Sequence, residues 1–142
     1  PILYSCHPRS KKFIQLRNFR FDERVIQHQP LGFHDYNKLQ QSAFCVVSDS
    51  GTIPEESAYF KFPAVSVRTS TERPEAMERG VFVVGSITTE QVLQAVELAV
   101  NMHKNSELAI GVPAYEENNV SVKVVKIIQS YVGIINKMVW RK

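Results

Sequence analysis

Residues 48–56 combine hydroxyl groups, a glycine and carboxylates between a strand-like apolar run and a predicted helix. The start of a helix offers unpaired backbone N–H groups and the positive end of the helix dipole, and both favour a bound phosphate. Gly51 lets the backbone approach an anion closely because it has no Cβ, and Ser50 and Thr52 add hydroxyl donors. The stretch therefore predicts a phosphate-binding turn at the beginning of a helix.

The same stretch also fits a purely structural interpretation. Thr52 and Glu55 have the spacing of a capping box, and Pro54 suits the first turn of a helix. The stretch lacks the lysine of a P-loop and the GxGxxG spacing of a dinucleotide site, so it favours neither of these. Glu56 is placed either to accept two hydroxyl hydrogen bonds from a ribose or simply to stabilise the helix dipole.

Two further loops carry residues suited to chemistry. In the first, Thr69 and Glu72 have the spacing of a second capping box, whereas Arg68 and Arg73 suit phosphates because a guanidinium donates two hydrogen bonds at once. In the second, His7 follows the first apolar run and is either a satisfied loop residue or an acid or base. The other three histidines show no partner pattern.

Short apolar runs alternate with helical patterns along the whole chain. Strands are expected at residues 2–6, 25–29, 43–47, 63–67 and 81–84. Helices are expected after a cap at Ser10, at 34–41 with Tyr36 and Leu39 inward, at 53–59, at 73–79 closed by Gly80, at 89–103 and at 120–139. This order predicts an α/β fold with a parallel sheet and helices on both faces. Ligands bind such folds at the carboxyl ends of the strands, where the loops above lie.

The composition excludes several classes of protein. The chain has 142 residues, 44% of them apolar and 22% charged, with a formal net charge of +3. These values are typical of one globular domain and not of a disordered, collagen-like or coiled-coil chain. No apolar run approaches the roughly 18–20 residues that cross a bilayer, so no membrane partner is expected. Cys6 and Cys45 are too few for a disulfide framework and lack a zinc pattern, so we expect buried free thiols in a reducing compartment.

The beginning of the chain has two notable features. Residues 9–24 carry a net charge of +4, from six basic and two acidic side chains, which favours an anionic small molecule or a local interface over nucleic acid. The chain also has no initiator methionine and opens within a strand-like run, without a signal-peptide pattern. We interpret this start as a cut inside a longer protein whose other domain holds part of any site.

Taken together, the motifs resemble the non-hydrolysing UDP-N-acetylglucosamine 2-epimerases. The segment SDSGTIPEE at 48–56 and the segment TERPEA at 71–76 match two motifs of that family, at a similar separation. The His-Pro pair at 7–8 and the segment PLGF at 30–33, followed by Tyr36, match two more. The resemblance covers nearly the whole chain.

The resemblance implies an enzyme of two Rossmann-like domains with a GT-B-like fold, of which residues 1–142 are the C-terminal, UDP-binding domain. Residues from about 120 to 142 would form a terminal helix that crosses toward the absent N-terminal domain. The implied reaction inverts C2 of a UDP-N-acetylhexosamine by eliminating and re-adding UDP, without a cofactor or a metal. The family's catalytic carboxylates lie in the N-terminal domain, so the chain alone is expected to be inactive. A cytoplasmic homodimer is implied for the full-length protein.

The resemblance also implies roles for individual residues by position. These residues are His7 as the functional histidine, Ser50, Gly51 and Thr52 in the diphosphate turn, Glu56 at the ribose, Phe33 and Tyr36 at the uracil, and Arg9, Glu72 and Arg73 in the diphosphate or sugar region.

The sequence departs from the common family pattern at two places. Thr52 stands where the second glycine of the turn is usual, and the loop before the last helix reads VPAY and then NNVS. These features look more like the branch that acts on modified UDP-N-acetylhexosamines in capsule and O-antigen synthesis, such as the enzyme forming UDP-N-acetyl-L-fucosamine. Three alternatives stay open: a GT-B glycosyltransferase, a non-catalytic UDP-sugar sensor, and a Rossmann-like domain used only for assembly.

Overall fold

A computed structural model describes residues 1–107 and 111–142 of the chain. Within it the backbone divides into two compact units, Pro1–Ala43 and Phe44–Lys142. Every pair of neighbouring strands in the described residues is parallel, as the alternation of strands and helices predicts. Each unit is therefore built from strand–helix–strand crossovers, because parallel strands need a crossover connection.

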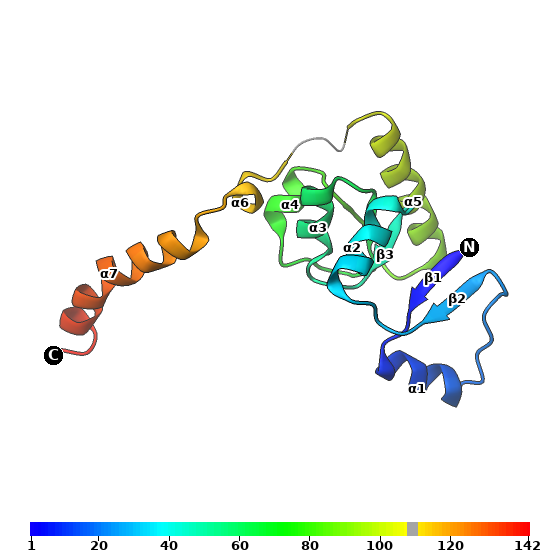
Figure 1. Ribbon diagram of the computed structural model, residues 1–142, viewed down its shortest axis with the longest axis horizontal. Helices are drawn as coiled ribbons and strands as arrows, with labels where there is room; N and C mark the ends of the chain where they lie inside the picture. The colour runs from blue at the N-terminus through cyan, green and yellow to red at the C-terminus, as the bar shows by residue number, and fades with distance from the viewer. Residues whose placement is uncertain (108–110) are drawn as a thin grey trace. The chain divides into compact units, whose positions relative to one another are not determined.

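The first unit contains β1 (Ile2–Ser5), α1 (Pro8–Leu16), β2 (Val25–His28) and α2 (Phe33–Ser42), as Figure 1 shows. Strands β1 and β2 pair in parallel, with Ile2 opposite Val25 and Ser5 opposite His28. Helices α1 and α2 follow directly from the carboxyl ends of these strands. This places the beginnings of both helices at the edge where ligands bind in α/β folds.

Two expectations for this unit are wrong in detail. Helix α1 begins at Pro8 with His7 as its cap, and not after Ser10, because the His7 ring accepts the Arg9 N–H and Pro8 has a preset backbone angle. Tyr36 is half-buried as expected, but Leu39 is 38% exposed. The buried residues of α2 are polar ones instead, Asn37 and Gln40.

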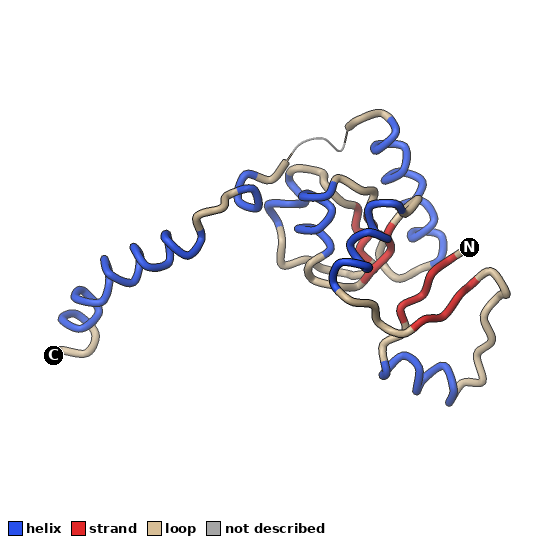
Figure 2. Tube along the Cα trace, in the orientation of Figure 1, coloured by secondary structure: helices blue, strands red, loops and turns tan. Residues whose placement is uncertain are grey.

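The second unit holds the remaining elements, drawn by type in Figure 2. They are β3 (Val46–Ser48), α3 (Ile53–Phe60), β4 (Ala64–Ser66), α4 (Pro74–Glu78), β5 (Val83–Val84), α5 (Thr89–Lys104), α6 (Pro113–Glu116) and α7 (Val120–Met138). The three strands form one parallel sheet in the order β3-β4-β5. Among the described residues of this unit, helix α6 is the one element that the sequence pattern did not predict.

The central strand β4 explains how helices cover both faces of this sheet. Side chains of a strand alternate between faces. Ala64 is fully buried in a cluster with Ile53 of α3 and Ala76 of α4, whereas the next residue, Val65, is fully buried with Ala99 of α5. The expected α/β fold with helices on both faces of a parallel sheet is therefore confirmed.

The ends of the helices show which of the predicted start and stop signals are correct. Gly80 has a φ of +65° just after α4, in the left-handed region that favours glycine, so its predicted role as a helix stop is confirmed. The capping box at Thr69 is absent, because α4 begins only at Pro74.

Helix α7 forms at the expected place, and none of its residues is buried. Among the described residues, no helix has the length and apolarity that crossing a membrane requires.

Gly85 allows helix α5 to approach the sheet closely. A Cβ at this position would lie 2.7 Å from Val65 Cγ1 and 3.1 Å from Ala95 Cβ. We expect Gly85→Ala to lower the free energy of unfolding by about 1–3 kcal/mol, measured by urea denaturation, because the packed neighbours must move. Gly133→Ala in α7 is the control, since its Cβ meets nothing within 4 Å and alanine favours a helix. Equal destabilisation by both changes would contradict this account.

Candidate functional site

The turn between β3 and α3 is the best-defined polar feature of the second unit. The N–H of Ser50 donates to Ser48 Oγ at 3.0 Å, which bends the chain as it leaves β3. Thr52 precedes α3 with near-helical angles, and its side chain makes no capping hydrogen bond. The predicted capping box between Thr52 and Glu55 is therefore absent. This leaves the hydroxyl group of Thr52 to a different partner.

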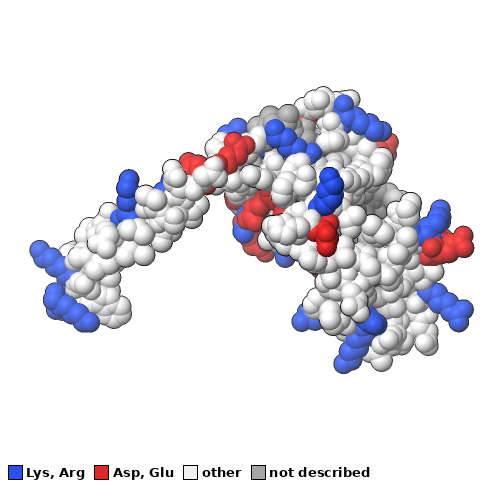
Figure 3. Space-filling view, in the orientation of Figure 1, with Lys and Arg blue, Asp and Glu red and all other residues white. Residues whose placement is uncertain are grey.

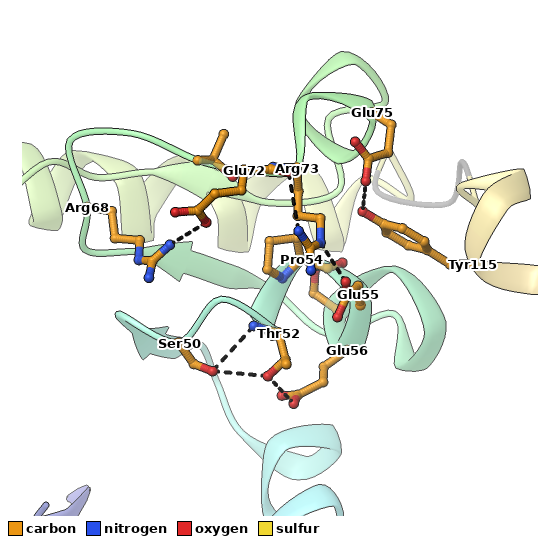
Figure 4. Close-up of polar contacts among 12 residues, drawn as sticks. Ser50, Thr52, Pro54, Glu55, Glu56, Arg68, Glu72, Arg73, Glu75 and Tyr115 are labelled. Carbon is orange, nitrogen blue, oxygen red and sulfur yellow. Dashed lines mark hydrogen bonds and ion pairs between the residues drawn. The ribbon is translucent and has the colours of Figure 1, made fainter. Parts of the chain in front are cut away.

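A continuous chain of hydrogen bonds runs along this turn, as Figure 4 shows. Thr52 Oγ1 donates to Glu56 Oε1 at 2.7 Å. Ser50 Oγ and Thr52 Oγ1 are 3.0 Å apart, so Ser50 is the donor of that pair. Ser50, Thr52 and Glu56, three residues predicted for one ligand, therefore lie in direct contact, with Gly51 between them. The arrangement gathers hydroxyl groups, a helix N-terminus and a carboxylate at the carboxyl end of a strand.

Arg68, just after β4, joins the second motif to this turn. Its Nε donates to the backbone oxygen of Asp49 at 2.8 Å. Its Nη1 donates to Glu72 Oε2 at 2.7 Å, as Figure 4 shows. The pKa of Glu72 is lowered by a hydrogen bond to its own backbone and by the Arg68 guanidinium. Glu72 is therefore held as a carboxylate on the loop that faces the turn.

Arg73 makes a second connection between the two motifs. Its Nε donates to Glu55 Oε1 at 2.5 Å, and its backbone N–H donates to Thr71 Oγ1 at 3.1 Å. The hydrogen bond and the charge of Glu55 raise the pKa of Arg73 above its usual value. Glu55 lies in the first turn of α3, so Arg73 fastens the loop after β4 to the beginning of that helix, whereas Arg68 fastens it to the turn before the helix.

Tyr115 of α6 is a residue of this region that sequence reasoning missed. Its hydroxyl donates to Glu75 Oε1 at 2.6 Å, across 40 positions of the sequence. An open pocket of about 330 Å³ lies beside it, lined by Glu55, Glu56, Tyr59, Phe60 and Tyr115. No local pattern links Tyr115 to Glu75, although the unassigned VPAY segment marked this loop as a departure from the family pattern.

The contact of Tyr115 with Glu75 gives a pH-dependent contribution to stability. The donated hydrogen bond lowers the pKa of Glu75, so its contribution is present above the unfolded value of 4.5 and is lost as the pH falls through the folded value. We expect the stability difference between the native chain and Tyr115→Phe to be largest near about pH 7 and to shrink below about pH 4.5, in urea denaturation across pH. A difference that stays constant over this range would contradict the role of the carboxylate.

The first unit carries the remaining candidate residues. His7 Nδ1 accepts the backbone N–H of Arg9 at 3.2 Å, and this places the proton of a neutral His7 ring on Nε2. Phe33, at the first position of α2, is 75% exposed and meets the His34 ring edge to face at 5.6 Å. The N–H of Tyr36 donates to Gly32 O at 3.0 Å in the same turn. All of them follow the carboxyl ends of β1 and β2.

The basic stretch of the first unit lies at its surface. All six of its Lys and Arg side chains are exposed, and Figure 3 shows basic groups that project from the molecule. Arg24 pairs with Asp22 at 2.7 Å, and this hydrogen bond lowers the pKa of Asp22 to about 2. The guanidinium of Arg17 stacks over the Phe13 ring at 5.9 Å. Part of the stretch is thus internally paired.

The structure offers no metal site within residues 1–107 and 111–142. No group of three or more His, Cys, Asp or Glu side chains there is arranged to hold an ion. Cys6 and Cys45 are free thiols, as expected, but both are half-buried and not fully buried. Burial raises the pKa of Cys45 to about 11, which keeps this thiol protonated at neutral pH.

Comparison with known proteins decides the family. Residues 1–129 match the family described as UDP-N-acetylglucosamine 2-epimerase. The chain belongs to this family. Among solved structures, the UDP-N-acetylglucosamine 2-epimerase of Rickettsia bellii is 39% identical and superposes with a TM-score of 0.86, covering 99% of this chain and 39% of that one.

Two relatives from Methanocaldococcus jannaschii extend the comparison. Its UDP-N-acetylglucosamine 2-epimerase is 31% identical over 73% of this chain and 30% of its own length. A crystal structure of the UDP-GlcNAc 2-epimerase in complex with UDP-GlcNAc and UDP has 30% identity and a TM-score of 0.64, over 70% of this chain and 29% of that one. The likeness to this family of structures confirms the expected GT-B-like α/β fold. The chain spans about a third of the length of these relatives.

Proposed function

We propose that this chain is the UDP-binding half of a nucleotide-sugar 2-epimerase. The observation that carries the proposal is the hydrogen-bonded series Ser50, Thr52 and Glu56 at the start of α3. It combines groups that suit a phosphate with a carboxylate that suits sugar hydroxyls, within one helical turn. The family match supports the same activity, since relatives named as epimerases include one whose structure holds UDP-GlcNAc and UDP.

Each part of the turn has its own role in the proposal. Gly51 and the hydroxyl groups of Ser50 and Thr52 bind the diphosphate, because the helix dipole and backbone amides favour an anion there. Glu56 accepts hydrogen bonds from the ribose hydroxyls. Its Oε1 already accepts the Thr52 hydroxyl at 2.7 Å, so the ribose-binding group is oriented by the phosphate-binding one.

Residues of the first unit have proposed roles of their own. Phe33 and Tyr36 hold the uracil in part through backbone groups of the turn that begins α2. His7 presents its Nε2–H group toward the reacting sugar, because Nδ1 is occupied by the Arg9 amide. Arg9 and the two motif residues Glu72 and Arg73 belong to the diphosphate or sugar region.

The proposed chemistry avoids a difficult proton removal. The hydrogen at C2 of a hexosamine is not adjacent to a carbonyl, so simple deprotonation and reprotonation at C2 faces a high barrier. Elimination breaks the C1–O bond to UDP as the C2 proton leaves, and it forms a 2-acetamidoglycal. Protonation of C2 on the opposite face, with re-addition of UDP to C1, then inverts C2. The site must therefore supply acid and base groups and hold free UDP during the intermediate.

The finer parts of the proposal concern the whole protein. We place the chain in the C-terminal part of a longer cytoplasmic protein that forms a homodimer and serves surface polysaccharide synthesis. We assign this protein to the branch acting on modified UDP-N-acetylhexosamines. Thr52, in place of a second glycine, supports that branch. Incubating the full-length protein with a panel of UDP-N-acetylhexosamines, with products resolved by NMR, identifies the substrate. Exclusive turnover of unmodified UDP-N-acetylglucosamine would contradict the branch.

Comparing the full-length protein with this chain tests whether UDP binding and catalysis depend on different parts of the protein. We expect both to bind UDP, and only the full-length protein to convert a UDP-N-acetylhexosamine into its 2-epimer. The reason is that the acid and base carboxylates would come from the absent domain. Turnover above background by the purified chain alone would show that its own residues suffice.

A further inference from the structure

We propose that Arg68 is a positioning residue that fixes the diphosphate turn before the ligand arrives, and that Glu72 acts through Arg68. This inference rests on the proposed function, because it names the residue that orients the proposed diphosphate-binding turn before the ligand binds. It gives Glu72 a role that needs no contact with the ligand. Nothing in the sequence pattern of the turn itself points to Arg68, which lies 19 positions further along the chain from Asp49.

The peptide group between Asp49 and Ser50 is held at both ends. Its carbonyl oxygen accepts the Arg68 Nε–H at 2.8 Å, and its N–H donates to Ser48 Oγ at 3.0 Å. The C=O and N–H of a planar trans peptide point in opposite directions. Two bonds on opposite sides therefore prevent this plane from rotating. Arg68 supplies the only one of these two bonds that comes from outside the turn.

Fixing that plane orients the amides that follow it. In the part of the chain that the structure describes, the N–H groups of Gly51 and Ile53 donate to no other residue. They are the backbone donors that a diphosphate would meet at the start of α3. Donors that are already oriented bind an anion without the cost of ordering the turn at the moment of binding. Loss of Arg68 therefore weakens the diphosphate contacts in particular.

The side chain of Arg68 suits this task better than a lysine would. Its guanidinium is planar and presents several N–H groups in fixed directions. One of them holds the Asp49 carbonyl while another holds Glu72 Oε2 at 2.7 Å, so Glu72 sets the orientation of the whole group. Arg68 is 32% exposed at its side chain, and Glu72 is 67% exposed. Glu72 thus lies on the solvent side of an arginine that faces the turn.

Titration calorimetry of the whole protein with UDP and with uridine tests the inference. We expect Arg68→Ala to weaken UDP binding about ten-fold, in line with a lost charged hydrogen bond, and to change uridine binding less than about two-fold. Arg68→Lys should restore only part of the loss, because one ammonium does not reproduce both directions. Arg79→Ala is the control for loss of a positive charge in the same unit.

A double-mutant cycle then tests whether Glu72 acts through Arg68. Glu72→Ala should weaken UDP binding in the native background and have no further effect in the Arg68→Ala background, because the two side chains form one unit. A Glu72 that touches the ligand directly would instead lower UDP affinity in both backgrounds. That additive result would overturn the indirect role.

Hydrogen exchange of the ligand-free protein gives a readout that is independent of UDP. We expect the Ser50 amide to exchange faster in Arg68→Ala, while the Val67 amide, bonded to Ser48 O at 3.0 Å just after β4, exchanges as in the native protein. Unchanged exchange at Ser50, or unchanged UDP affinity in Arg68→Ala, would overturn this inference without contradicting the proposed function. A native protein that binds no UDP would contradict the proposed function itself.

Discussion

Replacing His7 with asparagine is expected to lower kcat/KM of the full-length protein for its UDP-sugar by about 10²–10⁴-fold, the usual range for a lost acid–base group. The structure makes this a clean substitution. His7 caps α1 through Nδ1, which accepts the Arg9 amide at 3.2 Å. Asparagine is a strong cap residue and offers an oxygen at a similar place, so α1 keeps its beginning. The change therefore removes Nε2 without removing the cap.

A second substitution separates two modes of action of His7. Glutamine reaches further and places an N–H donor near the position of Nε2, but it does not transfer a proton. If His7 acts as a hydrogen-bond donor, His7→Gln retains most of the turnover that His7→Asn loses. If His7 transfers a proton, both variants lose turnover. Turnover by His7→Asn close to the native rate would remove His7 from the reaction altogether, and thermal melting of each variant confirms that the fold is intact.

Glu56→Gln is expected to weaken UDP binding about ten-fold or more. Hydrogen bonds to a charged group contribute about 1.5–3 kcal/mol, and a neutral amide oxygen accepts ribose hydroxyls less strongly. Glutamine also changes the contact with the Thr52 hydroxyl, which donates to Glu56 Oε1 at 2.7 Å. Titration with UDP and with uridine measures the effect, and both ligands should lose affinity because both contain the ribose.

The matched control is Glu90→Gln, which removes the same charge from the first turn of a different helix, α5. We expect this variant to bind UDP as the native protein does. Equal weakening by Glu56→Gln and Glu90→Gln would reduce the effect to overall charge. Unchanged binding in Glu56→Gln would contradict a ribose contact and favour a carboxylate that only stabilises the helix dipole.

Much of the architecture could be predicted from periodicity and end signals. Parallel strands alternating with helices, the helix that begins at Ile53 and the glycine stop at Gly80 all depend on local sequence. Local reasoning was wrong where two signals competed. Helix α1 begins at Pro8 with His7 as its cap, and not after Ser10, because proline is favoured at the first helical position. Thr52 bonds forward to Glu56 and not to the backbone, so the capping box did not form.

The contacts that assemble the candidate site could not be predicted locally. Arg68 reaches Asp49 across 19 positions, Arg73 reaches Glu55 across 18, and Tyr115 reaches Glu75 across 40. The first two contacts depend on β3 and β4 becoming neighbours in the sheet, and the third depends on α6 reaching α4. Periodicity alone fixes neither arrangement. The family motifs did contain Glu55, Glu72 and Arg73, but the pairing of these residues follows only from the fold. Their contact with a ligand stays a prediction.

Solvent deuterium exchange tests the central claim most directly. The full-length protein is incubated with a UDP-N-acetylhexosamine in heavy water, without any acceptor, and the sugar is analysed by NMR and mass spectrometry. A 2-epimerase that eliminates and re-adds UDP must place deuterium at C2 of the product. A UDP-sugar recovered without deuterium at C2 would contradict the account. In that case transfer of the sugar to an added acceptor would point to a glycosyltransferase, and binding without transfer to a UDP-sugar sensor.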